Sequence, residues 1–266
     1  MAYEAILFEK REHVAILTLN KPERLNAIGE ALRNDVIAAF AEARKDDDVR
    51  VLIVTGAGRG FCSGADLSGG FRAPTAADAP QNDRLDEDGW VGRWAKMFHG
   101  FDKPTIAAVN GVAAGAGMST ALACDLRVGS ENARFKAVFI ERNLSPDSGM
   151  SYFLPRIIGY ARACDLIFTS RAVDAQEAYR LGLLDRLVKH EALLEEAVKV
   201  ANEMTQWPPL ALRVSKRVVQ HNFEADLGSA MRYESVSLGF GRKAPNDARE
   251  ALAAFRDKRK ASYTGL

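Results

Sequence analysis

Two glycine-rich segments carry the residues of this sequence that are best suited to chemistry. They are Phe61–Leu67 and Asn110–Met118, and each follows an apolar run that predicts a buried strand. Small residues let a ligand carbonyl approach the backbone, and the first N–H groups of a helix are unpaired donors. One such segment alone is more often a tight turn. If the two converge, their amides can form an oxyanion hole.

Other chemical motifs find little support. In Gly56-x-Gly58-x-Gly60 the third glycine of a dinucleotide fingerprint would fall at Phe61, and no helical pattern follows. The four histidines have no spacing typical of metal ligands, so no metal site is predicted: His13, His99, His190 and His221. Because 36 Lys and Arg face 35 Asp and Glu, no overall field favours nucleic acid or an anionic membrane as partner.

The elements that must position these segments alternate between strand and helix, which is typical of an α/β fold. Strands are expected at Val14–Leu19, Val49–Thr55 and Thr105–Val109, with a helix at Ile28–Ala43 between the first two. From Asp174 onward the pattern is almost purely helical, and Asp174 and Gly182 are the expected cap and stop of the first of these helices. That first helix is expected at Ala175–Leu181, and further helices are expected at Glu191–Met204, Pro209–Gln220 and Asp247–Lys258.

Three segments bear on location and mobility. The uncharged stretch Thr105–Cys124 is too rich in Gly, Ala, Ser and Thr for a membrane span and divides better into strand, glycine turn and buried helix. Ala5–Phe8 predicts a first strand rather than a signal peptide. The polar segment Ser68–Asp88 is expected to be a lid or a surface excursion.

Three cysteines without a pairing pattern indicate reduced, buried thiols and a cytoplasmic location: Cys62, Cys124 and Cys164.

Four motifs together resemble the crotonase family, the enoyl-CoA hydratase and isomerase superfamily, and the likeness runs from Tyr3 to Gly265. They are Leu19–Ala27, Phe61–Leu67, Asn110–Met118 and Gly182-Leu183-Leu184-Asp185. The resemblance implies a crotonase-like spiral of ββα units over residues 1–204 and a C-terminal helical trimerisation region over residues 205–266. It also implies that the N–H groups of Ala65 and Ala116 hold the thioester oxygen of an acyl-CoA. Alanine stands at 116 where the family usually has glycine.

The resemblance further implies contacts with CoA. Arg24 and Leu25 would lie beside the nucleotide and pantetheine, and the backbone of Asp66 and Leu67 would line the adenine. Phe255 and Lys258 would close over the nucleotide from a neighbouring subunit of a homotrimer or dimer of trimers, although the basic run around Lys258 alone suggests only a solvated helix end. No cofactor is expected beyond the CoA moiety of the substrate.

The reaction depends on which acid is present. Hydratases of this family use two glutamates, and the matching positions here are Ser119 and Phe139, neither of which transfers protons usefully at neutral pH. Asp147 instead stands where several isomerases and one kind of dehalogenase keep a catalytic aspartate. On its own, Ser145–Gly149 would be a common turn or helix cap. By the resemblance, Asp147 is the acid and base of an isomerase.

One carboxylate is sufficient to move a double bond, because it can take a proton from C2 and return it at C4. Phe139, Ser119 and Met150 are then expected to line a dry substrate pocket. Apolar surroundings would raise the pKa of Asp147 and a helix start would lower it, so the sequence leaves the direction open. Within the family, the likeness is greatest to the isomerase type that interconverts a ring epoxide and an oxepin as CoA thioesters.

Three alternatives remain at this point. The protein could be a hydratase that uses a second acid such as Glu141. It could be a hydrolase or dehalogenase with Asp147 as nucleophile. It could also be a crotonase-fold binding protein without activity, for which the two missing glutamates would be the reason.

Overall fold

The long apolar segments pair into a mixed sheet in the computed structural model, which describes residues 3–68, 80 and 84–266. The sheet runs, in spatial order, through β1 (Ile6–Arg11), β2 (Val14–Leu19), β3 (Val51–Gly56), β5 (Thr105–Val109), β7 (Leu126–Ser130) and β10 (Arg186–Val188). β1 pairs antiparallel with β2, and the other neighbours pair in parallel. Continuous apolar runs are typical of parallel strands because both of their faces are buried.

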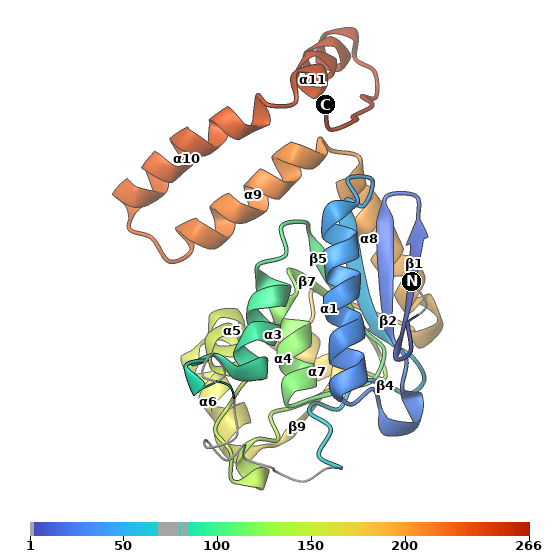
Figure 1. Ribbon diagram of the computed structural model, residues 1–266, viewed down its shortest axis with the longest axis vertical. Coiled ribbons are helices and arrows are strands. Elements are labelled where there is room, and N and C mark those ends of the chain that lie inside the picture. Colours follow the sequence, from blue (N-terminus) through green and yellow to red (C-terminus); the bar gives the residue numbers. More distant parts are fainter. Residues whose placement is uncertain (1–2, 69–79, 81–83) are drawn as a thin grey trace.

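Helices cover both faces of this sheet. Val14 and Ile16 of β2 pack with α8 (Leu193–Thr205), whereas Leu17, on the other face, belongs to the cluster around α1 (Glu30–Lys45). Side chains of a strand alternate between its two faces, so both clusters draw on the same strands. Figure 1 shows α1, α3 (Gly89–His99) and α4 (Ala116–Ala123) in front of the sheet and α8 behind it. The core therefore lies in two layers.

Short strands follow three of the long ones and form a second sheet. Its order within the described residues is β4 (Gly60–Cys62), β6 (Val112–Ala114), β8 (Arg134–Lys136) and β9 (Ala172–Asp174). A helix comes after each of the first three, so the chain repeats long strand, short strand and helix, which is the expected spiral of ββα units. The segment after Val109 was expected to be only a glycine turn; it also contains β6, because pairing with β4 and β8 extends it.

The helices that follow complete the core. They are α5 (Met150–Ile158), α6 (Tyr160–Thr169) and α7 (Ala175–Leu181), and single-turn helices lie at Pro22–Arg24, Ile140–Arg142 and His190–Ala192. The predicted ends of α7 are confirmed: the Asp174 carboxylate accepts the Glu177 N–H, and Gly182 is left-handed with φ of 86°. Leu183 and Leu184 are buried, so this motif anchors the core.

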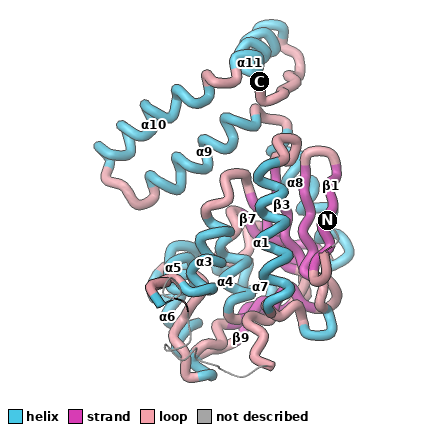
Figure 2. Tube along the Cα trace, viewed as in Figure 1, coloured by secondary structure: helices cyan, strands magenta, loops and turns pink. Residues whose placement is uncertain are grey.

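The residues after α8 form the helices α9 (Pro209–Asn222), α10 (Leu227–Gly241) and α11 (Pro245–Asp257). Figures 1 and 2 show this helical region projecting from one end of the core. The expected division at residue 204 falls in the last turn of α8. Polar contacts dock α9 on the core, among them Lys216 Nζ to Asp125 Oδ2 at 2.7 Å and Gln220 Nε2 to the His99 carbonyl at 2.9 Å.

A few expectations need correction or lie outside the described residues. Cys62 and Cys124 are buried as free thiols, but Cys164 is only half-buried because Ala163 and Leu166 form the buried stripe of α6 and Cys164 lies beside it. Most of Ser68–Asp88 falls outside the described residues. Among those that are described, we find no helix with the length and apolar character needed to cross a bilayer.

Candidate active site

The two glycine-rich segments lie side by side because β4 and β6 pair in parallel. Gly60 is opposite Val112 and Cys62 is opposite Ala113, so the turns that follow the two strands leave the sheet at the same edge. A β-carbon on Gly64 would lie 2.8 Å from the Ala114 carbonyl oxygen and 3.3 Å from the Ala116 nitrogen. The backbones are thus in direct contact, and only glycine fits at position 64.

The amides of Ala65 and Ala116 are both free donors. Residues 28 and 65 form an isolated β-bridge, in which the Ile28 N–H donates to the Gly64 carbonyl and the Asp66 N–H donates to the Ile28 carbonyl. Neither hydrogen bond uses the N–H of Ala65. Ala116 is the first residue of α4, after Gly115 with φ of 50°, so its N–H has no intrahelical acceptor. Among the described residues neither amide has an acceptor, and both residues line one cavity.

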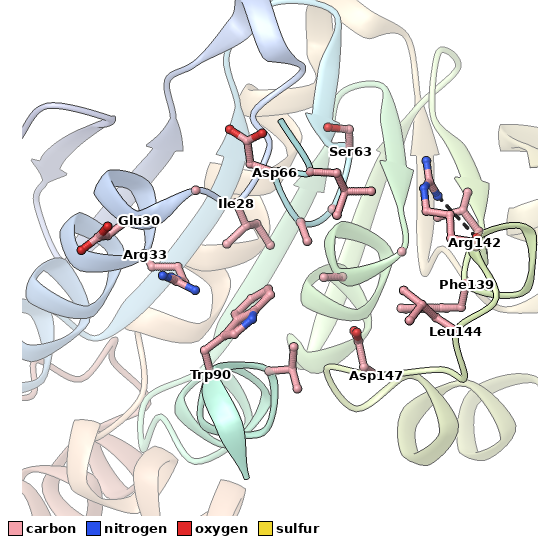
Figure 3. A pocket seen from close by; sticks show the side chains of 18 residues that line it. Ile28, Glu30, Arg33, Ser63, Asp66, Trp90, Phe139, Arg142, Leu144 and Asp147 are labelled. Atoms are coloured by element: carbon pink, nitrogen blue, oxygen red, sulfur yellow. Dashed lines mark hydrogen bonds between the residues drawn. The ribbon is translucent and has the colours of Figure 1, made fainter. Parts of the chain in front are cut away.

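This cavity has a volume of about 450 Å³ and opens between α1, α3, α4 and the segment that leads to α5. Figure 3 shows Ser63 and Asp66 on one side and Trp90 and Asp147 on the opposite side. Its wall is formed by Ile28, Gly29, Glu30, Arg33, Ser63, Gly64, Ala65, Asp66, Leu67, Trp90, Val91, Gly115, Ala116, Val138, Phe139, Arg142, Leu144 and Asp147.

Asp147 is an acid of this wall that has no cationic partner among the described residues. Its carboxylate points into the cavity (Figure 3), and Oδ1 accepts the Ser148 hydroxyl at 3.0 Å. Burial raises the pKa of Asp147, and the Ser148 hydrogen bond opposes the shift without cancelling it. The carboxylate does not cap α5, whose N-cap is Gly149 without a side-chain bond. Desolvation therefore decides the direction of the Asp147 pKa shift, which the sequence left open.

The three residues expected in the substrate pocket differ in position. Phe139 lines the cavity, whereas Ser119 and Met150 are fully buried and lie behind its wall, contrary to the expectation. The Ser119 hydroxyl donates to the backbone carbonyl of Asp147 at 3.1 Å and lies 3.3 Å from the Gly115 carbonyl. Ser119 therefore joins α4 to the Asp147 segment, a link that spacing along the chain does not reveal.

The residues expected around CoA divide into two groups. Asp66 and Leu67 line the cavity, and Arg24 Nη1 reaches Asp66 Oδ2 at 3.0 Å. Hydrogen bonds from Ser68 and the charge of Arg24 lower the pKa of Asp66, so this acid is ionised and paired. Leu25 is half-buried and left-handed, with φ of 51°, next to Gly60. These four residues form one corner of the site.

Phe255 and Lys258 lie elsewhere. Both belong to the end of α11, where Phe255 is 87% exposed and Lys258 ends the helix in a left-handed conformation. Neither lines the cavity, and Figure 1 shows α11 at the far end of the molecule. Within one chain, the structure does not bring them to the site.

Sequence reasoning missed several residues of the site. Asn26 is fully buried and its amide donates to the carbonyls of Gly60 and Phe61, which ties the first motif to β4. Asn26 belongs to the motif Leu19–Ala27, and this position could have indicated a structural role. Arg33 and Trp90 line the cavity from α1 and α3. Trp90 follows a segment without hydrophobic periodicity, and Arg33 has the position of an ordinary exposed helix residue. The sequence therefore did not indicate a role in the site for either residue.

The alternative acid Glu141 lies outside the cavity. It forms an ion pair with Lys136 at 2.6 Å, and that contact lowers its pKa. No group of three or more His, Cys, Asp or Glu side chains in the described part of the chain is arranged to hold a metal ion.

A ββα spiral whose short strands pair in parallel and bring two glycine-rich turns together is the crotonase fold. A solved structure with this fold, titled enoyl-CoA hydratase from Bacillus anthracis, superposes with a TM-score of 0.89 and 30% identity over 99% of this chain and 100% of that one. The family model for enoyl-CoA hydratase/isomerase matches residues 9–265. The chain therefore belongs to the enoyl-CoA hydratase/isomerase family.

Two curated relatives carry different names. The probable enoyl-CoA hydratase echA8 of Mycobacterium bovis is 37% identical over 99% of both chains. The 1,2-epoxyphenylacetyl-CoA isomerase of Escherichia coli is 34% identical over 98% of this chain and 99% of its own. Membership of the family is thus shown, and the reaction within it depends on the acids of the site.

Proposed function

We propose that the protein is an acyl-CoA isomerase that moves a double bond, with Asp147 as acid and base. The observation that carries the proposal is the position of Asp147: a half-buried carboxylate, without a cationic partner among the described residues, in the same cavity as the free amides of Ala65 and Ala116. A carboxylate with a raised pKa is suited to accepting and returning a proton near neutral pH.

The proposed reaction has two proton transfers. The Asp147 carboxylate takes a proton from C2 of a β,γ-unsaturated thioester, and the electron pair moves onto the thioester oxygen. The two amides stabilise the resulting dienolate, which carries its charge on that oxygen. Protonated Asp147 then returns the proton at C4, and the double bond ends between C2 and C3. The chemistry needs no cofactor beyond the CoA thioester itself.

The surroundings of Asp147 favour isomerisation over hydration. Hydration requires a group to activate water and a second one to protonate the α-carbon. Phe139 is apolar, and the Ser119 hydroxyl is engaged with backbone carbonyls behind the wall. Of the other cavity acids, Asp66 is paired with Arg24, and Glu30 points away from the cavity in Figure 3. Among the described residues that line the cavity, Asp147 is therefore the acid that remains for proton transfer.

The proposal extends to substrate class and assembly. The E. coli relative named 1,2-epoxyphenylacetyl-CoA isomerase supports ring-epoxide and oxepin thioesters as substrates beside enoyl-CoA esters. We also propose a homotrimer or dimer of trimers in which Phe255 and Lys258 reach the CoA site of a neighbour. Exposed apolar side chains on the C-terminal helices support assembly through this region: Val219, Leu227, Val236, Leu238 and Leu252.

The reaction can be identified with cis-3-hexenoyl-CoA in water enriched in oxygen-18. An isomerase converts it to the 2-enoyl thioester without incorporating the label. A hydratase leaves it unchanged, but adds labelled water to trans-2-hexenoyl-CoA, supplied in a parallel reaction, and forms a labelled 3-hydroxyacyl thioester. Labelled hydroxyacyl product at a rate equal to isomerisation would overturn the proposal. Oxygen-18 in the Asp147 carboxylate after a single turnover would instead support a nucleophilic role.

A further inference from the structure

Arg33 is a half-buried cation in the wall of the proposed active site. It lies one turn into α1, and its guanidinium carbon sits 5.0 Å from the centre of the Trp90 ring. Figure 3 shows the guanidinium directed toward Trp90, while the Glu30 carboxylate of the same helix points away. Such stacking holds the planar group in place but leaves its N–H donors unused.

Glu30 of the same helix forms no ion pair with Arg33, and the acids of the neighbouring segments are engaged elsewhere. Asp66 pairs with Arg24, Asp86 with Arg93, and Asp88 with Lys96. The pKa of Asp147 is shifted by burial and by the Ser148 hydroxyl and not by the charge of Arg33, so the two side chains do not form an ion pair. Among the described residues, the Arg33 guanidinium therefore has neither a carboxylate partner nor a hydrogen-bond acceptor. Because the donors of this half-buried guanidinium are unused, it can pair with an anion that enters the cavity.

Arg33 and Trp90 also separate the active-site cavity from a second one. This second cavity, of about 410 Å³, lies between α1 and α3 and is lined by Arg33, Asn34, Ile37, Trp90, Arg93, Trp94 and Met97. The Asp66 corner with Arg24 is the proposed CoA side of the site. Trp90 lies on the opposite side of the cavity (Figure 3), where the part of the acyl group remote from sulfur has room.

We infer that Arg33, held by Trp90, binds a carboxylate at the distal end of the acyl group, so that the preferred substrates are ω-carboxyacyl-CoA thioesters. This inference rests on the proposed function for the direction of the acyl group. An ionised carboxylate entering an apolar cavity loses hydration, and a preformed guanidinium replaces it with a bidentate, charge-assisted pair. A methyl-ended acyl group gains nothing from the same cation.

Binding of unreactive saturated thioesters tests this without depending on turnover. Calorimetry would compare glutaryl-, adipoyl- and suberyl-CoA with pentanoyl-, hexanoyl- and octanoyl-CoA. We expect the native protein to bind the carboxylated member of at least one pair about tenfold more tightly. Arg33→Met should abolish that preference and leave the affinity for the methyl-ended partner unchanged, whereas Arg33→Lys should restore part of it.

Arg142→Met is the matched control, because Arg142 lines the opposite wall and its Nη1 lies 3.4 Å from the Val138 carbonyl. It should keep the preference. The inference is wrong if the native protein shows no preference at any length, or if Arg142→Met removes the preference. It is equally wrong if Arg33→Met weakens all six thioesters alike, since Arg33 would then hold CoA. None of these results changes the labelled-water assay, so the two proposals fail separately.

Discussion

Gly64 lies against Ala116 so closely that a β-carbon on Gly64 would come within 3.3 Å of the Ala116 nitrogen. The two residues are 52 positions apart, yet this contact sets the separation between the amides of Ala65 and Ala116. The absence of a side chain at position 64 is therefore a requirement of the proposed oxyanion hole, in addition to the φ of 96° at this glycine.

Gly64→Ala should consequently lower kcat by about 10²–10³-fold, the loss typical of one oxyanion donor. Gly159→Ala is the matched control, because Gly159 also has a positive φ of 82° but nothing lies within 4 Å of its added β-carbon. Both variants place an alanine at a positive φ, which costs about 1–3 kcal/mol. Steady-state kinetics and thermal unfolding separate the effects; equal losses of kcat in the two variants would contradict this reading of Gly64.

Asp147→Asn should reduce turnover by about 10²–10⁴-fold, because the amide cannot accept the α-proton. Binding of hexanoyl-CoA should be unchanged, since the thioester oxygen is held by backbone groups. Glu30→Gln serves as control for a cavity acid that points away from the ligand space. Calorimetry and an isomerase assay measure both properties, and near-normal turnover in Asp147→Asn would remove this residue from the mechanism.

The raised pKa of Asp147 predicts a specific pH dependence. The carboxylate must be ionised to act as a base, so kcat/KM should fall as the pH drops through this raised pKa. Ser148→Gly removes the hydroxyl that lowers the pKa and suits the φ of 52° at this position. The acidic limb of its kcat/KM profile should move to higher pH. An unmoved limb would show that another group titrates there.

The same pKa shift predicts the stability of Asp147→Asn. The folded state holds the proton of Asp147 more tightly than the unfolded state, so the native protein loses stability as the pH rises from the unfolded to the folded pKa. Above that window, Asp147→Asn should unfold at a higher temperature than the native protein; below the unfolded pKa the difference should disappear. Thermal unfolding at several pH values, with Glu30→Gln alongside, measures it, and a destabilised variant at neutral pH would contradict it.

The proposed assembly predicts that CoA binding depends on the C-terminal helices of a neighbour. Phe255→Ala should weaken CoA binding although Phe255 is remote from the cavity of its own chain. Sedimentation should show three chains or a multiple of three. Leu7→Ala, a change at another exposed apolar side chain on β1, should leave CoA binding unchanged. A monomer that binds CoA with full affinity would refute the proposed assembly.

Much of the fold follows from local patterns. The apolar runs of β2, β3 and β5, the cap and stop of α7, and the glycine-rich segments are visible in the chain itself, because strand period, capping and left-handed turns each involve a few neighbouring residues. Four motifs in the sequence are sufficient to identify the family. β6 was missed, because it is three residues long and exists only through its pairing with β4 and β8.

The tertiary structure decided what depends on contacts between distant segments. Whether the pKa of Asp147 rises or falls depends on how completely packing removes water from its carboxylate, and Ser119 reaches this segment only because α4 lies beside it. Arg33 has an ordinary place in a helical pattern, and only the packing of α1 beside α3 leaves it without an acidic partner among the described residues. Desolvation and charge pairing are properties of a folded neighbourhood, which residue order along a single chain does not encode locally.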